Sequence, residues 1–307
     1  MAKRSGAARL RKAANRLSSA AYKRTRNSAQ LNRMTAATDA TTVALGRALT
    51  AVLRDSFSPD ELAWIRRIEA LRAEVSASAQ IVPMARKLPP AGAPPTLLRQ
   101  RGQLDGTPAE TAGKTGVTGV VGTICRNASK PKLWAALLFA LVRRLRPAAC
   151  LELGTCLGMS AAYQAAALEL NGHGKMVTLE GIEALAALAR QHFERLGLSR
   201  VEVVAGMFED TLADVLDEIS SVDFAFIDGR HNARATLEYY RAIAPFAGEN
   251  AVLVFDDIRW SQGMEEAWQT IVADELVVTS LDLFSMGVCV LNGGAKAERA
   301  SYRIALE

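Results

Sequence analysis

The sequence is most informative at Cys150-Leu151-Glu152-Leu153-Gly154-Thr155-Cys156-Leu157-Gly158. A short apolar run followed by a glycine-containing turn is typical of a buried strand that leads into a helix. The two glycines allow an unusual turn and let a ligand approach the backbone closely. We therefore interpret this stretch as a strand, then a ligand-binding turn, then a helix that begins at Ser160.

Short apolar strands and helical segments alternate from this stretch to Leu291. This rhythm predicts an α/β fold, with a mostly parallel sheet covered by helices on both faces. The last two strands have no full helix between them, which predicts an antiparallel hairpin at one edge. We expect seven strands, at residues 149–153, 176–179, 201–205, 222–227, 251–255, 277–283 and 287–291. The helices between them are expected at residues 160–170, 183–196, 212–219, 234–244 and 263–272.

Three regions differ in composition. Residues 1–35 are interpreted as a basic flexible arm, because the first 33 residues hold ten Lys or Arg and no acid. This composition also resembles that of an organelle transit peptide. Residues 36–122 are expected to form an N-terminal helical region and loop, with a capping box at Ser58-Pro59-Asp60-Glu61 and irregular chain up to Gly122. Residues 123–307 form the third region.

The overall composition excludes several classes of protein. Half of the 307 residues are hydrophobic, but no uncharged apolar run is long enough to predict a membrane span. The chain opens without a secretory signal pattern, so we expect a cytoplasmic protein. The four cysteines show no zinc-type spacing and are expected to be buried thiols. The net charge of +5 hides a basic arm and a mildly acidic remainder.

An acidic residue closes the second expected strand. Glu180 follows Gly154 by 26 residues, and its carboxylate can accept both hydroxyls of a ribose. Ligands of open parallel sheets bind beyond the carboxyl ends of the strands. A nicotinamide dinucleotide would fit this order of elements, but the turn lacks the Gly-x-Gly-x-x-Gly spacing that holds a pyrophosphate. We therefore favour an uncharged nucleoside.

Three carboxylates follow the fourth and fifth strands. Asp228 ends one strand, and Asp256 and Asp257 end the other. Because carboxylates that converge repel each other, a divalent cation such as Mg²⁺ is expected among them. The alternative is that Asp256 and Asp257 cap the turn that follows them. His231 lies three residues after Asp228 and can act as a general base near neutral pH.

These motifs resemble those of class I S-adenosylmethionine-dependent O-methyltransferases, in the branch of catechol O-methyltransferase and small bacterial methyltransferases. The resemblance covers about Ser129 to Leu291, with a weaker match at Ala63-Trp64-Ile65-Arg66-Arg67-Ile68-Glu69. It implies that residues 123–307 form an S-adenosylmethionine-dependent methyltransferase domain with a Rossmann-like sheet. It also implies that the cofactor S-adenosylmethionine contacts Glu152, Gly154, Thr155, Cys156, Gly158, Ser160, Glu180, Gly181, Met207, Phe208 and Asp228. Glu152 and Ser160 would lie near its methionine part, and Phe208 would pack on its base.

The same resemblance implies the reaction. Asp228 and His231 are the expected catalytic residues, and Asp228, Asp256 and Asp257 the expected Mg²⁺ ligands. In the family the last ligand is often an amide, so Asp257 departs from the pattern. The expected activity is metal-assisted methyl transfer to an oxygen, a hydroxyl or a carboxylate, of a small-molecule or peptide acceptor.

Two other functions remain open. The basic arm could guide a nucleic-acid methyltransferase or bind another anionic partner. The chain could instead be a non-catalytic binding protein of the same fold. The apolar N-terminal helices could also form a homodimer interface.

Overall fold

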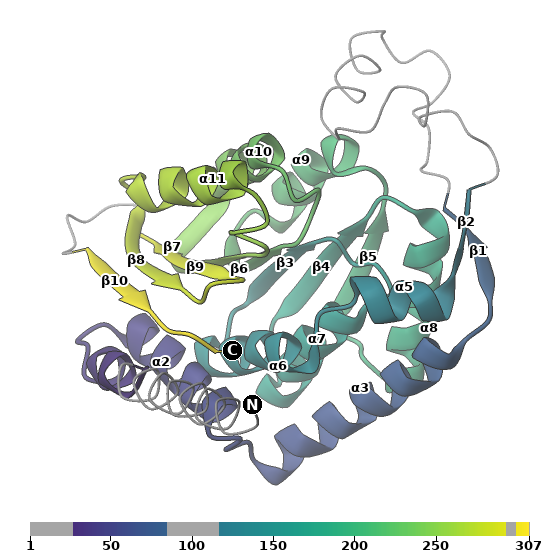
Figure 1. The fold of residues 1–307 in the computed structure, drawn as a ribbon, viewed down its shortest axis with the longest axis horizontal. Coiled ribbons are helices and arrows are strands. Elements are labelled where there is room, and N and C mark those ends of the chain that lie inside the picture. The colour runs from purple at the N-terminus through teal and green to yellow at the C-terminus, as the bar shows by residue number, and fades with distance from the viewer. Residues whose placement is uncertain (1–26, 85–116, 293–298, 307) are drawn as a thin grey trace, which may run out of the picture.

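The computed structural model describes residues 27–84, 117–292 and 299–306 of the chain. Figure 1 shows a central sheet with helices on both faces. Within the described ranges the sheet has eight strands in the order β10-β8-β9-β7-β6-β3-β4-β5. The strands are β3 (Ala149–Leu153), β4 (Lys175–Glu180), β5 (Val201–Ala205), β6 (Val222–Ile227), β7 (Ala247–Phe255), β8 (Val277–Asp282), β9 (Gly287–Leu291) and β10 (Ala300–Arg303).

The order of the strands fixes where a ligand can bind. From β3 the chain moves outward to β4 and β5, and then crosses back to β6 on the other side of β3. The carboxyl ends of β3 and β6 therefore flank the point where strand order reverses, the usual ligand site of open α/β sheets. β9 pairs antiparallel with both β7 and β8 and is the sheet's one antiparallel strand within the described residues. The expected antiparallel hairpin of β8 and β9 is thereby confirmed, although β10 and not the hairpin forms that edge of the sheet.

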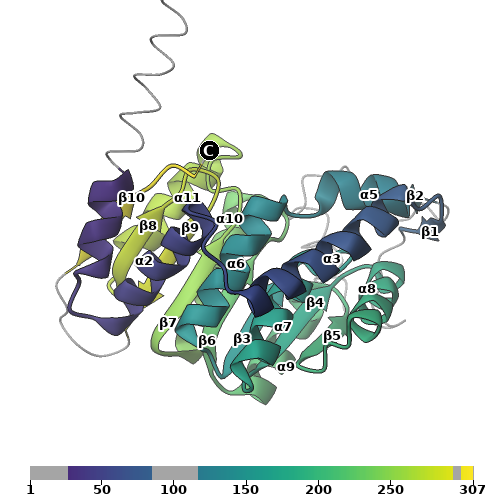
Figure 2. The same ribbon diagram turned by 90° about the horizontal axis from the view of Figure 1, so that it is seen from below.

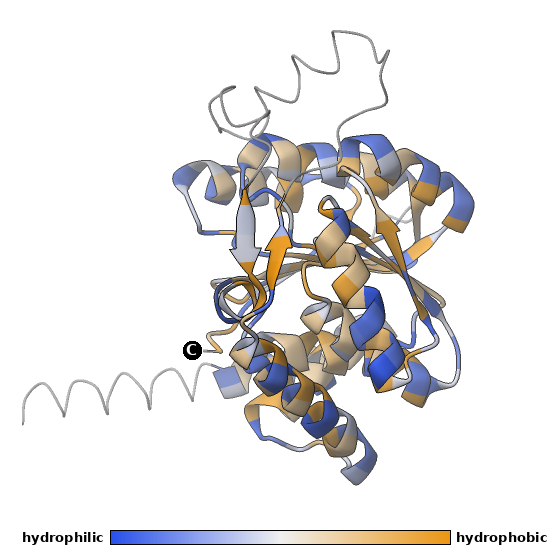
Figure 3. Cartoon of the chain, turned by 90° about the vertical axis from the view of Figure 1, so that its right-hand side faces the viewer, coloured by the Kyte–Doolittle hydropathy of each residue, from blue (hydrophilic) through white to orange (hydrophobic). Residues whose placement is uncertain are grey.

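Alternate residues of the strands face opposite layers of helices. Cys150, Phe224 and Phe226 belong to one buried cluster, and Leu151 and Ala225 to the other. The first face is covered by α6 (Lys132–Leu145), α7 (Met159–Asn171) and α8 (Glu183–Leu196), and the second by α9 (Phe208–Ile219), α10 (Ala233–Ile243), the short η2 (Ala244–Phe246) and α11 (Gln262–Ala273). Figure 3 shows mostly hydrophobic strands, and outer helices that mix hydrophobic and hydrophilic residues. The expected α/β class follows from this two-residue period.

The N-terminal region adds an outer layer of helices. The helices α2 (Ala40–Leu53) and α3 (Pro59–Ala77) lie over α6 and α7, as Figure 2 shows. The expected capping box at the start of α3 is confirmed by reciprocal hydrogen bonds between Ser58 and Glu61. Glu61 is 2% exposed and also binds the guanidinium groups of Arg143 and Arg144 on α6. The two regions therefore share one hydrophobic core.

The clearest differences from the sequence prediction concern short or terminal elements. Residues 27–35 are helical, with Leu31 and Met34 in the core, so this part of the expected arm is folded. Residues 1–26 of the arm and most of the expected irregular chain, residues 85–116, lie outside the described residues. The expected loop before Gly122 includes β2 (Thr118–Val120), which pairs with β1 (Ile81–Pro83), and is followed by α5 (Val121–Ala128). β10 is an eighth strand, which pairs parallel with β8.

Candidate functional site

The glycine turn after β3 is held against the next strand. The amides of Gly154 and Thr155 both donate to the carbonyl of Leu179, at 3.0 and 3.1 Å. Gly154 has a φ of +106° and Gly158 a φ of +79°, values that favour glycine. A Cβ atom at Gly154 would lie 2.2 Å from the carbonyl oxygen of Asp228. The turn therefore requires glycine at position 154 to let β3 and β6 end side by side.

Glu180, at the end of β4, connects the glycine turn after β3 to β4. One carboxylate oxygen accepts the amide of Cys156 at 2.7 Å, and the other accepts the amide of Ile182 at 2.9 Å. The residue is 8% exposed. Since each carboxylate oxygen has two lone pairs, backbone amides leave capacity for further donors. Glu180 closes β4, as the sequence predicted, and its contact with a ribose stays a prediction.

Glu152 lies beneath the turn in a closed polar network. Its carboxylate accepts hydrogen bonds from Gln164 at 2.8 Å and from Thr178 at 2.6 Å, and the Ser160 side chain also bonds to it. The Thr178 hydroxyl also lies 2.6 Å from that of Thr155. Burial raises the pKa of Glu152 to about 7, although these hydrogen bonds oppose the shift. The network thus holds a carboxyl that changes charge near neutral pH.

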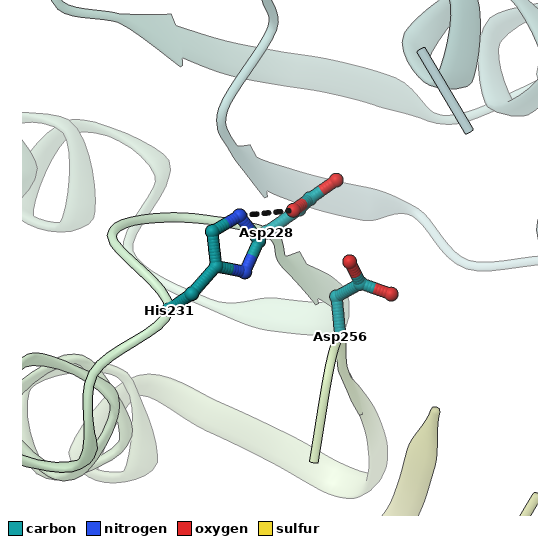
Figure 4. A group of neighbouring side chains, drawn as sticks. All are labelled: Asp228, His231 and Asp256. Carbon is teal, nitrogen blue, oxygen red and sulfur yellow. Dashed lines mark ion pairs between the residues drawn. The ribbon is translucent and has the colours of Figure 1, made fainter. Parts of the chain in front are cut away.

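Asp228 and His231 lie at the end of β6. The amide of Asp228 donates to Leu153 at 2.9 Å, which places its carboxylate beside the glycine turn. Nε2 of His231 lies 3.6 Å from Asp228, the pair drawn in Figure 4, and Nδ1 lies 3.1 Å from Asp257. The hydrogen bond to Asp257 raises the pKa of His231 despite partial burial, with Asp228 adding to the effect. The structure thus brings together three of the residues predicted to form the reaction site.

Lys130, which was not predicted from the sequence, also lies at this site. It comes from the segment before α6 and pairs with the carboxylates of Asp228 and Asp256. Its ammonium contacts the carboxylate of Asp256 and lies 3.6 Å from that of Asp228. The Asp256 side chain is 2% exposed and that of Lys130 15% exposed. Burial and the neighbouring Asp228 raise the pKa of Asp256 to about 8, against the effect of Lys130. Lys130 precedes α6, which leads back to the start of β3. The start of α6 therefore lies near the carboxyl edge of the sheet, where Asp228 and Asp256 follow their strands. That topology was the available signal.

The expected metal ligands are arranged differently from the prediction. Ligand atoms of Asp228, His231 and Asp256 lie within 4.8 Å of one another, a spacing that a cation could bridge. Asp257, the third expected ligand, instead faces His231. The ammonium of Lys130 contacts both Asp228 and Asp256, and it would repel a divalent cation bound there. As these side chains lie, they do not fit a divalent metal ion.

The remaining expected cofactor residues gather beyond β4, β5 and β6. Met207 is 8% exposed, and its sulfur would lie 3.0 Å from a Cβ atom at Gly181. Phe208 packs edge-on against Tyr239 at 5.7 Å and covers Gly229. Phe208 therefore has a packing role, and its predicted contact with a base stays a prediction.

Arg230 and Trp260 complete the surroundings of the site. Arg230, with a side chain 8% exposed, pairs with Glu209 at 2.6 Å and joins the β6 loop to α9. Trp260 is 70% exposed and its ring lies 6.0 Å from that of His231. Trp260 is therefore not packed in the hydrophobic core. An exposed aromatic surface borders the imidazole.

Comparison with known proteins identifies the domain that carries this site. Residues 151–258 match the family model described as a methyltransferase domain. The match spans the glycine turn, Glu180, Asp228, His231 and both aspartates after β7. This segment is therefore a methyltransferase domain, as the sequence resemblance predicted. No curated protein sequence matches the chain.

Solved structures with a similar arrangement include three methyltransferases. The O-methyltransferase of Bacillus cereus, in complex with S-adenosylhomocysteine, is 22% identical, covers 74% of this chain and 100% of its own, and has a TM-score of 0.47. The O-methyltransferase TomG of Streptomyces achromogenes, in complex with S-adenosylmethionine, is 22% identical, with coverages of 54% and 82% and a TM-score of 0.47. The methyltransferase PaMTH1 of Podospora anserina, bound to S-adenosylhomocysteine, is 17% identical, with coverages of 75% and 96% and a TM-score of 0.47. The identification of the domain rests on the family match and not on these three structures.

Proposed function

We propose that the chain transfers the methyl group of S-adenosylmethionine to an oxygen atom of an acceptor. The main support is the position of Glu180, whose carboxylate binds the turn after β3 at the point where strand order reverses. A carboxylate there can accept the two ribose hydroxyls of a nucleoside. Glu152, buried beneath the turn, would attract the cationic amine of the methionine part. The family match to a methyltransferase domain supports methyl transfer as the reaction.

The residues beyond β6 support transfer to oxygen. S-adenosylmethionine, when bound, supplies a methyl group on a sulfonium and leaves as S-adenosylhomocysteine. His231 would take the proton of an acceptor hydroxyl as its oxygen attacks that methyl group, and Asp257 would hold the imidazole in orientation. A carboxylate acceptor would need no base. Positioning beside the sulfonium would contribute most of the rate acceleration.

We leave the expected divalent cation out of this reaction. The carboxylates that were expected to bind it already have cationic partners, because Lys130 contacts Asp228 and Asp256, and His231 contacts Asp257. Mg²⁺ was inferred because the three carboxylates need positive charge near them. Lys130 and protonated His231 supply positive charge there.

Isothermal titration with S-adenosylmethionine tests the proposed donor. The wild-type chain is expected to bind it in a one-to-one complex, and Glu180→Ala is expected to weaken binding at least about tenfold, the effect of losing hydrogen bonds to a charged group. Glu202→Ala is the matched control, since Glu202 is exposed on the edge strand β5 and should bind as the wild type does. The proposal fails if the wild-type chain shows no binding, or if both variants weaken it equally.

The acceptor is proposed to be a small molecule or a peptide, with Trp260 as an apolar surface beside the imidazole. The nucleic-acid alternative depends on residues 1–26, which lie outside the described structure. Removing only these residues tests it, because residues 27–35 belong to the folded core. No helix in the described ranges is long and apolar enough to cross a bilayer.

A further inference from the structure

A lysine far from the catalytic loop in sequence occupies the centre of the carboxylate cluster. Lys130 lies 98 residues before Asp228 and 126 before Asp256 in the sequence, yet its ammonium contacts the second and lies 3.6 Å from the first. Its side chain is 15% exposed, so solvent does not replace these partners. A buried ammonium is stable only when it is paired, and here two carboxylates from adjacent strands β6 and β7 supply the pairing.

Side chains of the cluster offset most of its negative charge without an added ion. Asp228, Asp256 and Asp257 bring three carboxyl groups, and each lies within 3.6 Å of the Lys130 ammonium or of the His231 imidazole, which is cationic when protonated. Lys130 faces Asp228 and Asp256, and His231 faces Asp228 and Asp257. A divalent cation between Asp228 and Asp256 would have to displace the ammonium, whose charge would otherwise repel it at close range.

The backbone around Lys130 limits the ways in which it could withdraw. Pro131 follows it and disfavours helical geometry at position 130. Pro131 is the N-cap of α6, and every residue from Trp134 to Val142 on that helix is buried. The root of the side chain is thus anchored to the core, and its length carries the ammonium into the site.

We propose that Lys130 takes the place of a divalent cation in this methyltransferase, so that the chain works without a bound metal ion. This inference rests on the proposed function, in which Asp228 lies beside the reacting groups. Lys130 is a positioning residue: it holds the carboxylates of Asp228 and Asp256 in place and offsets their charge. Its removal should therefore create a metal site where the wild-type chain has none.

Titration of the full chain with Mn²⁺ alone tests this inference without an acceptor. Calorimetry should detect no Mn²⁺ binding by the wild type and one binding site in Lys130→Met. Because one opposing charge near the ligands has gone, the variant should bind Mn²⁺ at least about tenfold more tightly than any weak binding that the wild type shows. Lys132→Met is the matched control, because Lys132 is exposed at the start of α6 and should leave the wild-type result unchanged.

Two further variants locate the gained site. Lys130→Arg keeps the positive charge and should bind no Mn²⁺, and Asp256→Asn in the Lys130→Met background should abolish the gained binding. Specific Mn²⁺ binding by the wild type, with loss in Asp256→Asn, would overturn the inference. It would also be overturned if neither the wild type nor Lys130→Met bound Mn²⁺, because the carboxylates would then form no cation site even without the lysine.

The folded state and the donor are checked separately. Circular dichroism should show the wild-type spectrum for Lys130→Met. Should that variant not fold, Lys130→Gln replaces it in the same Mn²⁺ titrations. Titration of the wild type with S-adenosylmethionine belongs to the proposed function. Its failure with an unchanged Mn²⁺ result would remove the donor assignment, whereas wild-type Mn²⁺ binding with intact donor binding would remove only the role of Lys130.

Discussion

Nδ1 of His231 lies 3.1 Å from a carboxylate oxygen of Asp257, which comes from the neighbouring strand end. The imidazole is therefore held from one side and turns Nε2 toward Asp228. Both backbones adopt positive φ values, +36° at His231 and +51° at Asp257. Such conformations are uncommon for residues other than glycine, and they bring the two side chains together in the loops beyond β6 and β7.

This pair predicts how the histidine titrates. The pKa of His231 lies above its ordinary value of 6.5 because Asp257 favours the protonated ring. The neutral base should therefore appear only as pH rises through this raised value. Asp257→Asn should lower the pKa of His231, and base-dependent activity should begin at a lower pH.

The chain has three histidines, so proton NMR can follow each one directly. His231→Ala assigns one signal, and its pKa in the wild type should exceed 6.5. His192 provides an internal control, because burial lowers its pKa. An unchanged His231 signal in Asp257→Asn would show that the pair does not control the base.

Glu152 predicts a pH dependence of cofactor binding. Burial raises its pKa to about 7, so the carboxylate is ionised above that pH and neutral below it. If it attracts the cationic amine of S-adenosylmethionine, affinity should rise with pH through about 7 and then level off. Below about 7, affinity should fall by up to about tenfold per pH unit, the limit for one linked proton.

Calorimetry at several pH values measures this dependence. Glu152→Gln should bind more weakly at pH 8 and should lose the dependence near pH 7. A variant that kept the wild-type pH profile would exclude Glu152 as its source. Asp223→Asn is a suitable control, because Asp223 binds the amides of Ala148 and Ala149 at the opposite end of β3.

Gly154 predicts a steric effect that a matched glycine does not share. Gly154→Ala would place a Cβ atom 2.2 Å from the Asp228 carbonyl, whereas a Cβ atom at Gly172 would meet nothing within 4 Å. Both have positive φ, +106° and +73°. Each change should therefore carry a backbone cost of about 1–2 kcal/mol.

Only Gly154→Ala should lower the stability by more than this backbone cost and also weaken cofactor binding. Thermal unfolding and titration with S-adenosylmethionine check the two effects. Gly172→Ala should bind the cofactor normally. Equal losses of stability and affinity in both variants would show that the close approach of β3 to β6 does not matter.

Glu61 predicts a pH dependence of folding stability. It is buried and accepts hydrogen bonds from Arg143, Arg144 and the Ser58 amide. Burial alone would raise its pKa, but these partners lower it below the ordinary 4.5. The ionised group thus stabilises the folded state above pH 4.5, and that stabilisation is lost as pH falls through the lowered value.

Denaturant unfolding checks this prediction. Glu61→Gln should lower the free energy of unfolding at pH 7 by about 1.5–3 kcal/mol, the usual contribution of hydrogen bonds to a charged group. The difference from wild type should shrink toward pH 3. The exposed neighbour Asp60 supplies the control Asp60→Asn, which should change stability little. A pH-independent difference would contradict the ionic role.

Local patterns were sufficient to predict most of the fold. The strand bounds at Ala149–Leu153, Val201–Ala205 and Gly287–Leu291 agree with the structure, because each is a short apolar run between turn signals. β10 was missed because Ala-Ser-Tyr-Arg carries no apolar run, and its place depends on pairing with β8. Residues 27–35 were assigned to the arm from charge, while Leu31 and Met34 bury themselves in the core.

Site residues that directly follow a strand could be predicted from the sequence. Site residues that come from distant segments of the chain were harder to predict. Asp228 and His231 follow β6, so their meeting could be inferred from the parallel sheet. Lys130 left only a weak signal, the position of the segment before α6 at the carboxyl edge of the sheet, and nothing in a lone lysine before a proline indicates that it is buried against Asp256. The expected metal rested on three carboxylates without this fourth partner. The pairing of Asp257 with His231 likewise depends on two loop conformations that the sequence pattern does not specify.

The two ends of the described chain meet. The side chain of Asn27 donates to the carbonyl of Ala305 at 2.6 Å and accepts its amide at 3.2 Å. A short linker could therefore join these ends covalently without disturbing the sheet, and circular permutation of the domain becomes practicable. New termini opened in an exposed turn far from β3 and β6 would leave the glycine turn, Lys130 and His231 in unbroken order, and would show whether the fold needs its natural starting point.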